Sequence, residues 1–346
     1  MGTSRQIKVG ILTAPKIEFE QKEKTFILKN VRIGIGFHWD RHEDQEFAGS
    51  LEIRNNPDGT QTAINTIDLE DYLCSVISSE MNANSPMELL KAHAVISRSW
   101  AIRAMQKPNH EGFDVCADDH CQRYEGLRRM NERAVEAVQA TRGQVLMFGD
   151  EICDCRYYKC CGGRTEIWRT CWEDIDVPYI QSVQCDYCKS PSPKVLRLVL
   201  NDYDQETKDF RDWKVSYTQE ELSEIIRTKS GIDFGEIIDL IPLHRGASGR
   251  IDSLKIVGTK HTEIIGKELK IRYWLSKSCL YSSWFEVEKT ITNDLSPITF
   301  TLIGHGWGHG AGLCQIGAAV MASEGHKYEE ILSYYYVGSR LSTPAQ

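Results

Sequence analysis

The hydrophobic period of the chain changes near Asp68, and this change is the feature that most limits its fold. Residues 7–66 alternate apolar and polar side chains in short runs, interrupted by the turn-forming segment 55–59. A period of two predicts β-hairpins with one buried face. From Asp68 onward, apolar side chains recur at the spacing of one helix face: Leu69, Tyr72, Leu73 and Val76. Short strands followed by helices predict an α+β fold.

A second helix is predicted to begin after Ser85. Ser85 suits the N-cap, Pro86 the first helical position, and Glu88 would close a capping box. The first helix should end near Ser79, which leaves Glu80 in the link between the two helices. The later patterns predict helices at 131–140, 218–227, 315–323 and 328–336. They also predict a strand at 144–148, a second strand that ends at residue 159, and short strands within 250–303. Residues 189–216 are expected to form an exposed connection.

The net charge of −8 is spread along the chain, so no basic surface for a polyanion is indicated. We therefore expect no nucleic-acid partner. No run approaches the roughly 20 apolar residues that span a bilayer, and the first residues lack the apolar core of a secretory signal. Either the protein is cytosolic, or a cloning-derived start at residues 1–4 replaces a leader.

Cysteines and histidines form one compact group in the sequence. Cys116 and Cys121 are accompanied by His120, and His110 lies shortly before them. Two thiolates and two imidazoles would make the Cys₂His₂ set of a closed tetrahedral zinc site. A Cys116–Cys121 disulfide or free thiols are the alternatives.

A larger group of cysteines crowds into residues 153–188. It is compatible with a second metal site or with two or three disulfides, and spacing alone selects no pairing. Its members are Cys153, Cys155, Cys160, Cys161, Cys171, Cys185 and Cys188. Cys74, Cys279 and Cys314 stand alone.

Glycine occupies every even-numbered position of the segment 304–312. If this segment is extended, His305, Trp307 and His309 project from one side, and bare backbone faces the other. An aromatic ring between two imidazoles beside bare backbone would suit a sugar ring. The alternative is a glycine-rich packing turn with a buried tryptophan.

Two shorter segments are ambiguous when considered alone. Glu80 follows an apolar helix face, where a single carboxylate is usually solvated or paired with an arginine. The segment 160–165 places two glycines, a guanidinium and a hydroxyl at a turn, which can bind a ligand or simply reverse the chain.

Considered in order, these motifs resemble the SpoIID/LytB (stage II sporulation protein D) family. The resemblance covers about residues 60–338. It rests on the segments 69–73, 79–81, 91–95, 98–101, 114–116, 120–126, 162–165, 249–250, 304–310 and 315–318. Several motifs in the same order make the resemblance more specific than any one of them.

The resemblance implies a lytic transglycosylase, a lyase that cleaves peptidoglycan glycan strands between MurNAc and GlcNAc. It implies that Glu80 is the catalytic acid and base. It also implies a structural zinc ion on His110, Cys116, His120 and Cys121, which would brace the following loop. The residues implied to bind glycan are Arg98, Gln122, Tyr124, Gly162, Gly163, Thr165, His305, Trp307, His309 and Gln315.

A single carboxylate is chemically sufficient for such a reaction. Ordinary glycosidases use two carboxyl groups, and the second acts as a nucleophile or activates water. If the muramic acid's own 6-hydroxyl attacks C1, the glutamic acid that protonated the leaving oxygen can take up the hydroxyl proton. The product would carry a 1,6-anhydro-MurNAc end.

The resemblance also shapes the expected organisation. A β-rich N-terminal segment (1–66) should precede a catalytic domain (67–346). The core of that domain would be 67–185 and 300–338, with 189–299 as an inserted or flanking β-rich part. We expect its helical and β-rich subdomains to flank a glycan-binding groove.

Two departures from the family pattern affect the expected glycan surface. Cys314 stands where the last motif usually has serine, and Cys160-Cys161 precede the Gly-Gly turn where the family has small hydroxyl residues. Some relatives resemble amidase enhancers that bind the wall without cleaving it, which is one alternative function. A zinc- or thiol-based redox protein is another, and it would require reactive surface cysteines.

The expected location is extracytoplasmic, at the cell envelope, with the leader missing from this sequence. The expected partners are peptidoglycan glycan strands, and other cell-wall hydrolases are further candidates.

Overall fold

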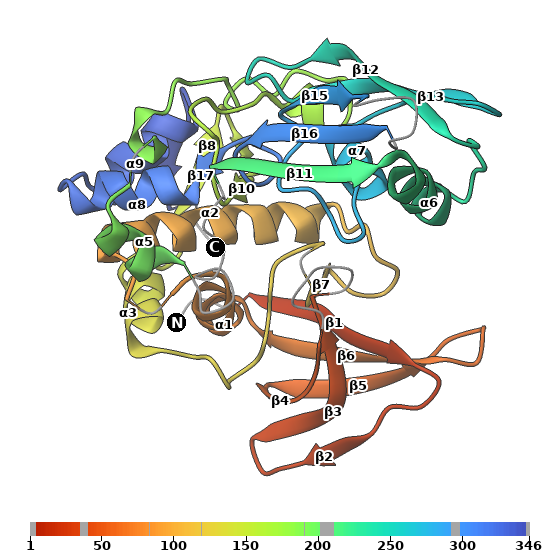
Figure 1. Cartoon of the computed structure of the whole chain (residues 1–346). Coiled ribbons are helices and arrows are strands. Elements are labelled where there is room, and N and C mark those ends of the chain that lie inside the picture. The colour runs from red at the N-terminus through yellow and green to blue at the C-terminus, as the bar shows by residue number, and fades with distance from the viewer. Residues whose placement is uncertain are drawn as a thin grey trace.

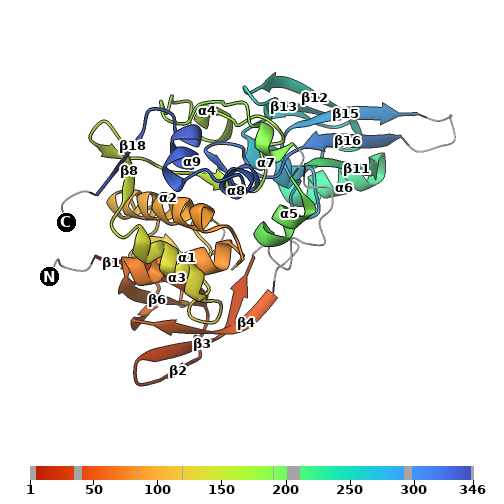
Figure 2. The ribbon, with the colours of Figure 1, turned by 90° about the vertical axis from the view of Figure 1, so that its left-hand side faces the viewer.

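A long helix, α2 (Met87–Gln106), crosses the middle of the molecule. The N-terminal strands lie on one side of it and a second β-rich unit lies on the other (Figure 1). The turned view shows α1 (Leu69–Glu80) and α3 (Glu132–Ala140) packed beside α2 (Figure 2). The computed structural model describes residues 5–34, 41–82, 84–118, 120–189, 191–200, 211–291 and 298–343. The predicted α+β fold class is confirmed.

Two sheets form the N-terminal region, as the alternating pattern predicted. One has the strand order β5-β6-β1-β7, in which β1 is antiparallel to β6 and parallel to β7, and the other has the order β2-β3-β4. The bounds are β1 (Gln6–Ala14), β2 (Phe19–Gln21), β3 (Thr25–Ile33), β4 (Arg41–Ala48), β5 (Ser50–Asn55), β6 (Gln61–Asp68) and β7 (Val115–Cys116).

The N-terminal strands and the central helices share one hydrophobic core. Ile7, Phe26 and Phe47 are 0% exposed and belong to the same buried cluster as Leu73 and Val95. There is therefore no break in packing at residue 66, because the inner faces of these sheets are covered by the helices that follow them.

Helix α1 is held at both ends by the signals that its sequence carries. The Asp68 side chain accepts a hydrogen bond from the backbone N–H of Glu70, which caps the first turn. Met81 leaves the helix in an extended conformation, so Glu80 is the last residue of α1 rather than part of a link. The backbone that carries the Glu80 carboxylate is therefore part of a helix and is held rigidly.

The capping box predicted at the start of α2 is wrong. Pro86 is the N-cap and makes no side-chain capping bond. The Ser85 hydroxyl donates to the carbonyl oxygen of Leu198, and Glu88 bonds to Lys91 and to the N–H of Tyr328 instead. The side chains of Ser85 and Glu88 therefore make other contacts instead of capping the helix.

A second β-rich unit, residues 212–305, has its own core around Trp213, Phe234, Phe285 and Phe300. Its sheets have the strand orders β11-β16-β15 and β12-β13-β14. The strands are β11 (Asp212–Thr218), β12 (Ile237–Arg245), β13 (Ile251–Gly258), β14 (Thr262–Ile265), β15 (Phe285–Thr290) and β16 (Thr299–His305), and the helices are α6 (Gln219–Ser230) and α7 (Glu268–Trp274).

The predicted exposed connection at 189–216 is more ordered than expected. It contains the helix α5 (Pro193–Val199), whose Val195 and Val199 are buried, and the first part of β11. Residues 201–210 of that prediction lie outside the described residues.

Short elements join the two β-rich regions. β18-β8-β9 form one small sheet, and β10 pairs in parallel with β17. Their bounds are β8 (Val145–Phe148), β9 (Glu151–Ile152), β10 (Tyr157–Tyr158), β17 (Leu313–Cys314) and β18 (Arg340–Ser342), with α4 (Trp168–Cys171), the 3₁₀ turn η1 (Asp186–Cys188), α8 (Gln315–Ser323) and α9 (Tyr328–Tyr335). No helix within the described ranges is long and apolar enough to cross a membrane.

Candidate active site and metal-binding residues

Glu80 sits, partly exposed, at the C-terminal end of α1. Its Oε1 accepts hydrogen bonds from the backbone N–H of Arg123 (3.0 Å) and from the Tyr157 hydroxyl (3.1 Å). Burial, and then the negative charge of Glu80, raises the pKa of Tyr157 well above its usual range, so the phenol keeps its proton and donates. Two donors from separate segments thus orient the carboxylate.

A buried polar layer supports this arrangement. The Tyr72 hydroxyl donates to Oε1 of Gln122 (3.2 Å), and Nε2 of Gln122 donates to the carbonyl oxygen of Ser97 (3.4 Å). Gln122 is 1% exposed, so it positions its neighbours and presents no surface to a glycan. The prediction of a direct glycan contact by Gln122 is corrected to a supporting role.

His93 is part of the same layer and was not among the predicted site residues. Its Nε2 lies 3.0 Å from Nε2 of Gln315, which can only donate, and its Nδ1 lies 3.3 Å from the Ser97 hydroxyl. The ring packs edge-on against Tyr157 with centroids 4.4 Å apart. Gln315, 3% exposed, therefore orients His93 rather than a glycan. Only the family-like run 91–95 pointed to this histidine.

The unfolding free energy should fall as the pH drops below about 6.5. The pKa of His93 is lowered to about 3, first by burial and then by the Lys159 ammonium. Because the folded-state pKa is depressed, His93 protonates in the unfolded chain first. Its stabilising contribution is then complete above the unfolded pKa and declines by about 1.4 kcal/mol per pH unit below it.

Urea unfolding at about pH 7 and about pH 5.5 measures this decline. His93→Gln, which keeps hydrogen-bonding capacity but cannot titrate, should lose roughly 1 kcal/mol less than the parent over that interval. If both proteins lost the same unfolding free energy over this interval, His93 would not be the cause of the pH dependence.

The four predicted metal ligands come together in the structure. One donor atom from each of His110, Cys116, His120 and Cys121 lies within 4.8 Å of the others. His110 Nε2 is 3.2 Å from Cys121 Sγ, and His120 Nδ1 is 3.5 Å from Cys121 Sγ and 3.8 Å from Cys116 Sγ. Zn–N bonds of about 2.0 Å and Zn–S bonds of about 2.3 Å require separations of this size. The donor set fits one tetrahedral zinc ion.

The two thiols of this group have different pKa shifts. Hydrogen bonds from Cys121 and from His120 lower the pKa of the Cys116 thiol to about 4. The hydrogen bond with Cys116 in turn raises the pKa of His120. It also raises the pKa of the Cys121 thiol. Cys116 is therefore a thiolate, the form of cysteine that binds zinc, whereas His120 and Cys121 would each release a proton when an ion binds.

The loop that carries the four predicted metal ligands is directly coupled to Glu80. Arg123, whose N–H bonds to the carboxylate, follows Cys121 by two positions in the chain. Closing the loop around an ion would thus fix one of the two donors to Glu80. All four ligand positions are protein side chains, so such an ion would have no open position for activating water.

The glycine-rich segment is not an extended strand. β16 ends at His305, and Gly306, Gly308, Gly310 and Gly312 follow with φ values of +76°, +99°, +89° and +87°. Successive left-handed glycines turn the chain at alternate residues. The prediction that His305, Trp307 and His309 project from one side is therefore wrong.

The glycines let protein, rather than ligand, approach closely. A Cβ on Gly304 would lie 2.1 Å from the Trp213 ring, and one on Gly310 would lie 2.6 Å from the guanidinium carbon of Arg250. Arg250 is 0% exposed and donates through Nε to the carbonyl oxygen of Gly308 (3.1 Å). The alternative interpretation, a packing turn with a buried tryptophan, describes the backbone better, although Trp307 is partly exposed.

Gly310→Ala is expected to reduce the unfolding free energy by about 3 kcal/mol or more, because it combines backbone strain with a clash against a buried side chain. Gly59→Ala is a matched control: Gly59 has φ +85° but no atom within 4 Å of an added Cβ. It should lose only the conformational cost of about 1–2 kcal/mol. Thermal or urea unfolding of both variants gives the comparison, and similar losses would contradict the packing role of Gly310.

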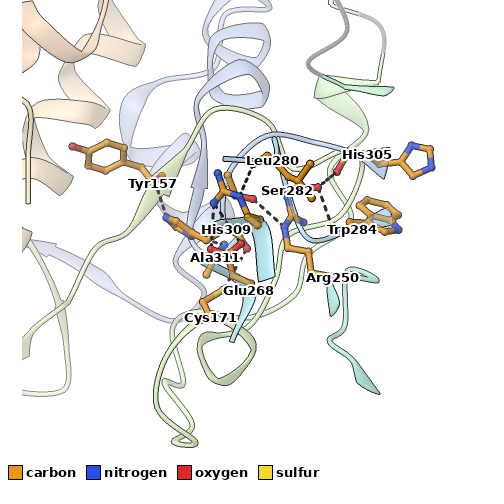
Figure 3. Close-up of polar contacts among 12 residues, drawn as sticks. Tyr157, Cys171, Arg250, Glu268, Leu280, Ser282, Trp284, His305, His309 and Ala311 are labelled. Atoms are coloured by element: carbon orange, nitrogen blue, oxygen red, sulfur yellow. Dashed lines mark hydrogen bonds and ion pairs between the residues drawn. The ribbon is translucent and has the colours of Figure 1, made fainter. Parts of the chain in front are cut away.

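The two histidines of this segment have different surroundings (Figure 3). His309 lies between Tyr157 and Arg250; its Nε2 donates to the carbonyl oxygen of Tyr157 (3.0 Å), and its Nδ1 accepts from the N–H of Ala311 (3.1 Å). Burial, and then nearby arginines, lowers the pKa of His309 well below its usual range. His309 is thus a neutral structural residue that anchors the strand carrying Tyr157.

His305 and Trp307 remain partly exposed, beside two further aromatic residues. His305 packs against Trp284, with ring centroids 5.0 Å apart, and Trp307 meets Tyr281 at 5.1 Å. Gly162 fits beneath Trp284, since an added Cβ would lie 2.9 Å from that ring, whereas Gly163 faces open space. We name the surface formed by Tyr281, Trp284, His305 and Trp307 the aromatic surface.

Three predicted glycan-binding residues are buried and bonded within the protein. Arg98, 1% exposed, forms a bidentate ion pair with Glu70 at 2.7 and 2.8 Å. Tyr124, 2% exposed, donates to Asn65 (2.7 Å). Thr165, 0% exposed, exchanges hydrogen bonds with residues 181 and 183. These predictions are corrected, because side chains so enclosed cannot reach a polymer.

Comparisons with known protein families match two separate parts of the chain. Residues 57–148 match the family described as Stage II sporulation protein, and residues 166–312 match a domain of unknown function (DUF8618). The first match contains Glu80 and the four predicted His/Cys metal ligands, and the second contains the aromatic surface and the whole glycine-rich segment.

Relatives align over most of the chain. An uncharacterized protein of Brachyspira hyodysenteriae is 30% identical over 294 residues, which is 85% of this chain and 71% of that protein. The stage II sporulation protein D of Bacillus subtilis is 27% identical over 81% of this chain and 76% of its own length. The amidase enhancer of Bacillus subtilis is 26% identical over 78% of this chain but 40% of its own length. With the motif order, the family match and these alignments in agreement, the chain belongs to the stage II sporulation protein D family.

Proposed function

We propose that the protein is a lytic transglycosylase that cleaves peptidoglycan glycan strands, with Glu80 as its acid and base. The observation that carries this proposal is the position of Glu80. Its Oε1 is held by Arg123 N–H and by the Tyr157 hydroxyl, and these donors come from the loop that carries the predicted metal ligands and from β10. Two separate family-like segments, 79–81 and 120–126, thus meet β10 at one partly exposed carboxylate.

The reaction needs one proton-carrying group. Protonated Glu80 gives its proton to the glycosidic oxygen as the bond from C1 to that oxygen breaks. The 6-hydroxyl oxygen of the same muramic acid forms the new bond to C1, and its proton returns to Glu80. The product is a 1,6-anhydro-MurNAc end, and no water is consumed. The Tyr157 phenol and Arg123 N–H keep the carboxylate in one orientation throughout.

The aromatic surface is the proposed glycan-binding region. Rings of Tyr281, Trp284 and Trp307 are partly exposed and suit the apolar faces of pyranose rings. Lys159 links this surface to the catalytic end: its Nζ lies 5.9 Å from the Trp307 ring centre, and it follows Tyr157 by two residues. A strand bound along the surface would lead toward Glu80.

The His110/Cys116/His120/Cys121 group is proposed to bind a structural zinc ion, and the protein is proposed to act outside the cytoplasm, where its substrate is located. Glycan strands are the proposed partners. Two relatives are named for stage II sporulation and one for enhancing an amidase. These names support a role in sporulation and cell-wall metabolism.

Incubation of the protein with purified peptidoglycan, followed by mass spectrometry of the released material, tests the proposal. New anhydro-muramoyl ends are the expected result. The second candidate is a non-catalytic, wall-binding amidase enhancer, which the likeness to such a protein favours. Binding to peptidoglycan without anhydro-muramoyl ends, together with stimulation of an added amidase, would establish that candidate instead.

A further inference from the structure

We propose that Cys161, Cys185, Cys188 and Cys314 bind a second zinc ion in a buried tetrathiolate site. Their four Sγ atoms all lie within 4.8 Å of one another, and each side chain is 0% exposed. In a tetrahedral site with Zn–S bonds of about 2.3 Å, the sulfurs are about 3.8 Å apart. The four thiols therefore enclose room for one metal ion, and their composition is that of a closed structural site.

Three segments far apart in the chain contribute the ligands. Cys161 lies in the turn after β10, Cys185 and Cys188 lie at η1, and Cys314 ends β17 and caps α8. The Cys-x-x-Cys spacing of Cys185 and Cys188 is the common spacing of paired zinc ligands. A bound ion would fasten the Gly-Gly turn and η1 to the start of α8.

Polar hydrogens point at the sulfur atoms, as is usual around metal-bound thiolates. Such donors stabilise a negative sulfur more than a neutral thiol. The contacts are Cys161 N–H to Cys314 Sγ (3.3 Å), Gly317 N–H to Cys314 Sγ (3.4 Å) and Gly163 N–H to Cys161 Sγ (3.4 Å). The Tyr335 hydroxyl lies 3.3 Å from Cys185 Sγ and would donate to it if that sulfur were a thiolate.

The backbone around the site leaves space only for the sulfurs. A Cβ on Gly317 would lie 2.8 Å from Cys185 Sγ, 3.4 Å from Cys314 Sγ and 2.3 Å from the Tyr335 hydroxyl. Glycine at this position therefore lets the first turn of α8 approach the thiols.

The charge balance of the site is also favourable. Zinc binding replaces the four thiol protons, so the ion and four thiolates carry a net charge of −2. Nη1 of Arg250, which is 0% exposed, donates to the carbonyl oxygen of Cys161 (3.4 Å). A buried cation next to the site offsets part of the cost of burying that charge.

A disulfide accounts for the arrangement less well. The Sγ atoms of Cys161 and Cys188 lie 3.1 Å apart, compared with about 2.05 Å in a disulfide. A Cys161–Cys188 disulfide would leave Cys185 and Cys314 as buried neutral thiols. The hydrogen-bond donors around them would then have no thiolate to stabilise.

The departures from the family pattern have the same explanation. Cys161 and Cys314 stand where the family has small hydroxyl residues, and they lie 153 positions apart in the chain. Both converge on the only Cys-x-x-Cys pair in the sequence. Two isolated replacements that meet at such a pair indicate one shared ligand set.

Metal analysis of the purified chain tests the proposal. We expect two zinc ions per chain in the parent, and one in a Cys185→Ser/Cys188→Ser variant. Cys161→Ser should also lose one ion. Cys171→Ser is the matched control, because Cys171 is also a buried cysteine but lies outside the set of four, and its Sγ contacts the carbonyl oxygens of Ile167 and His309 instead. It should retain both ions.

A second measurement on the parent protein keeps the test valid if the variants do not fold. Acid unfolding in a chelator should release two zinc ions and expose all 12 cysteines as free thiols. A disulfide within the set, iron in place of zinc, or a second ion retained by Cys161→Ser would overturn the proposal. Loss of this ion leaves the Cys116/Cys121 group intact, so the result does not depend on the transglycosylase proposal.

Discussion

Glu80→Gln should lower the release of anhydro-muramoyl ends by about 10²–10⁴-fold, the usual effect of losing a general acid or base. Glutamine keeps the size of the side chain, and its amide oxygen can still accept from Arg123 N–H and the Tyr157 hydroxyl. It cannot give or take the catalytic proton. Glycan binding and folding should therefore be retained.

Product analysis by mass spectrometry, with peptidoglycan pull-down of the same preparation, separates turnover from binding. Glu324→Gln is a suitable control, because it makes the same replacement at an exposed position at the end of α8. It should leave both quantities unchanged. If Glu80→Gln released product at nearly the parental rate, Glu80 could not be the catalytic acid and base, and the proposed mechanism would be wrong.

Loss of the ion at the His110/Cys116/His120/Cys121 group should destabilise the protein and reduce turnover together. Metal binding at a closed site is coupled to local folding, and the loss of a structural metal is among the few single changes that cost 4 kcal/mol or more. We expect the Cys116→Ser/Cys121→Ser variant to melt on the order of 10 °C below the parent. Turnover should fall because the loop no longer holds Arg123 N–H on Glu80.

Metal content and thermal unfolding measure the two parts of this prediction. Cys279→Ser is the control, since Cys279 is a half-buried cysteine outside both groups. It should keep its metal content and melting temperature. A parent protein without stoichiometric zinc, and with Cys116 disulfide-bonded to Cys121, would contradict the prediction.

Local patterns were sufficient for most elements of the fold. The apolar face of α1 and the bounds of α8 follow from spacings within one or two turns, which act before any tertiary contact forms. The capping signal at Ser85 failed for the opposite reason. Its hydroxyl found a partner 113 residues away, in Leu198, which no local rule includes.

The metal groups show the same division. The His-Cys group lies within twelve residues and comes together in one loop, so spacing alone could nominate it. The tetrathiolate group needed Cys314, which stands far from the other cysteines in sequence. The sequence showed that cysteine replaces the family's serine at position 314. Which cysteines it would meet depended on the parallel pairing of β17 with β10.

The sequence by itself determined the α+β class, the location of Glu80 close to the end of the first helix and the identity of the family, whereas the structure showed that Glu80 is the last residue of that helix. Those properties depend on residue type and order along the chain. Only the tertiary structure decided that Arg98, Tyr124 and Thr165 are internal, and that the alternating glycines turn to admit Arg250 and Trp213. Burial and close approach depend on which distant segments pack together, because each is a property of two surfaces and a local pattern describes only one of them.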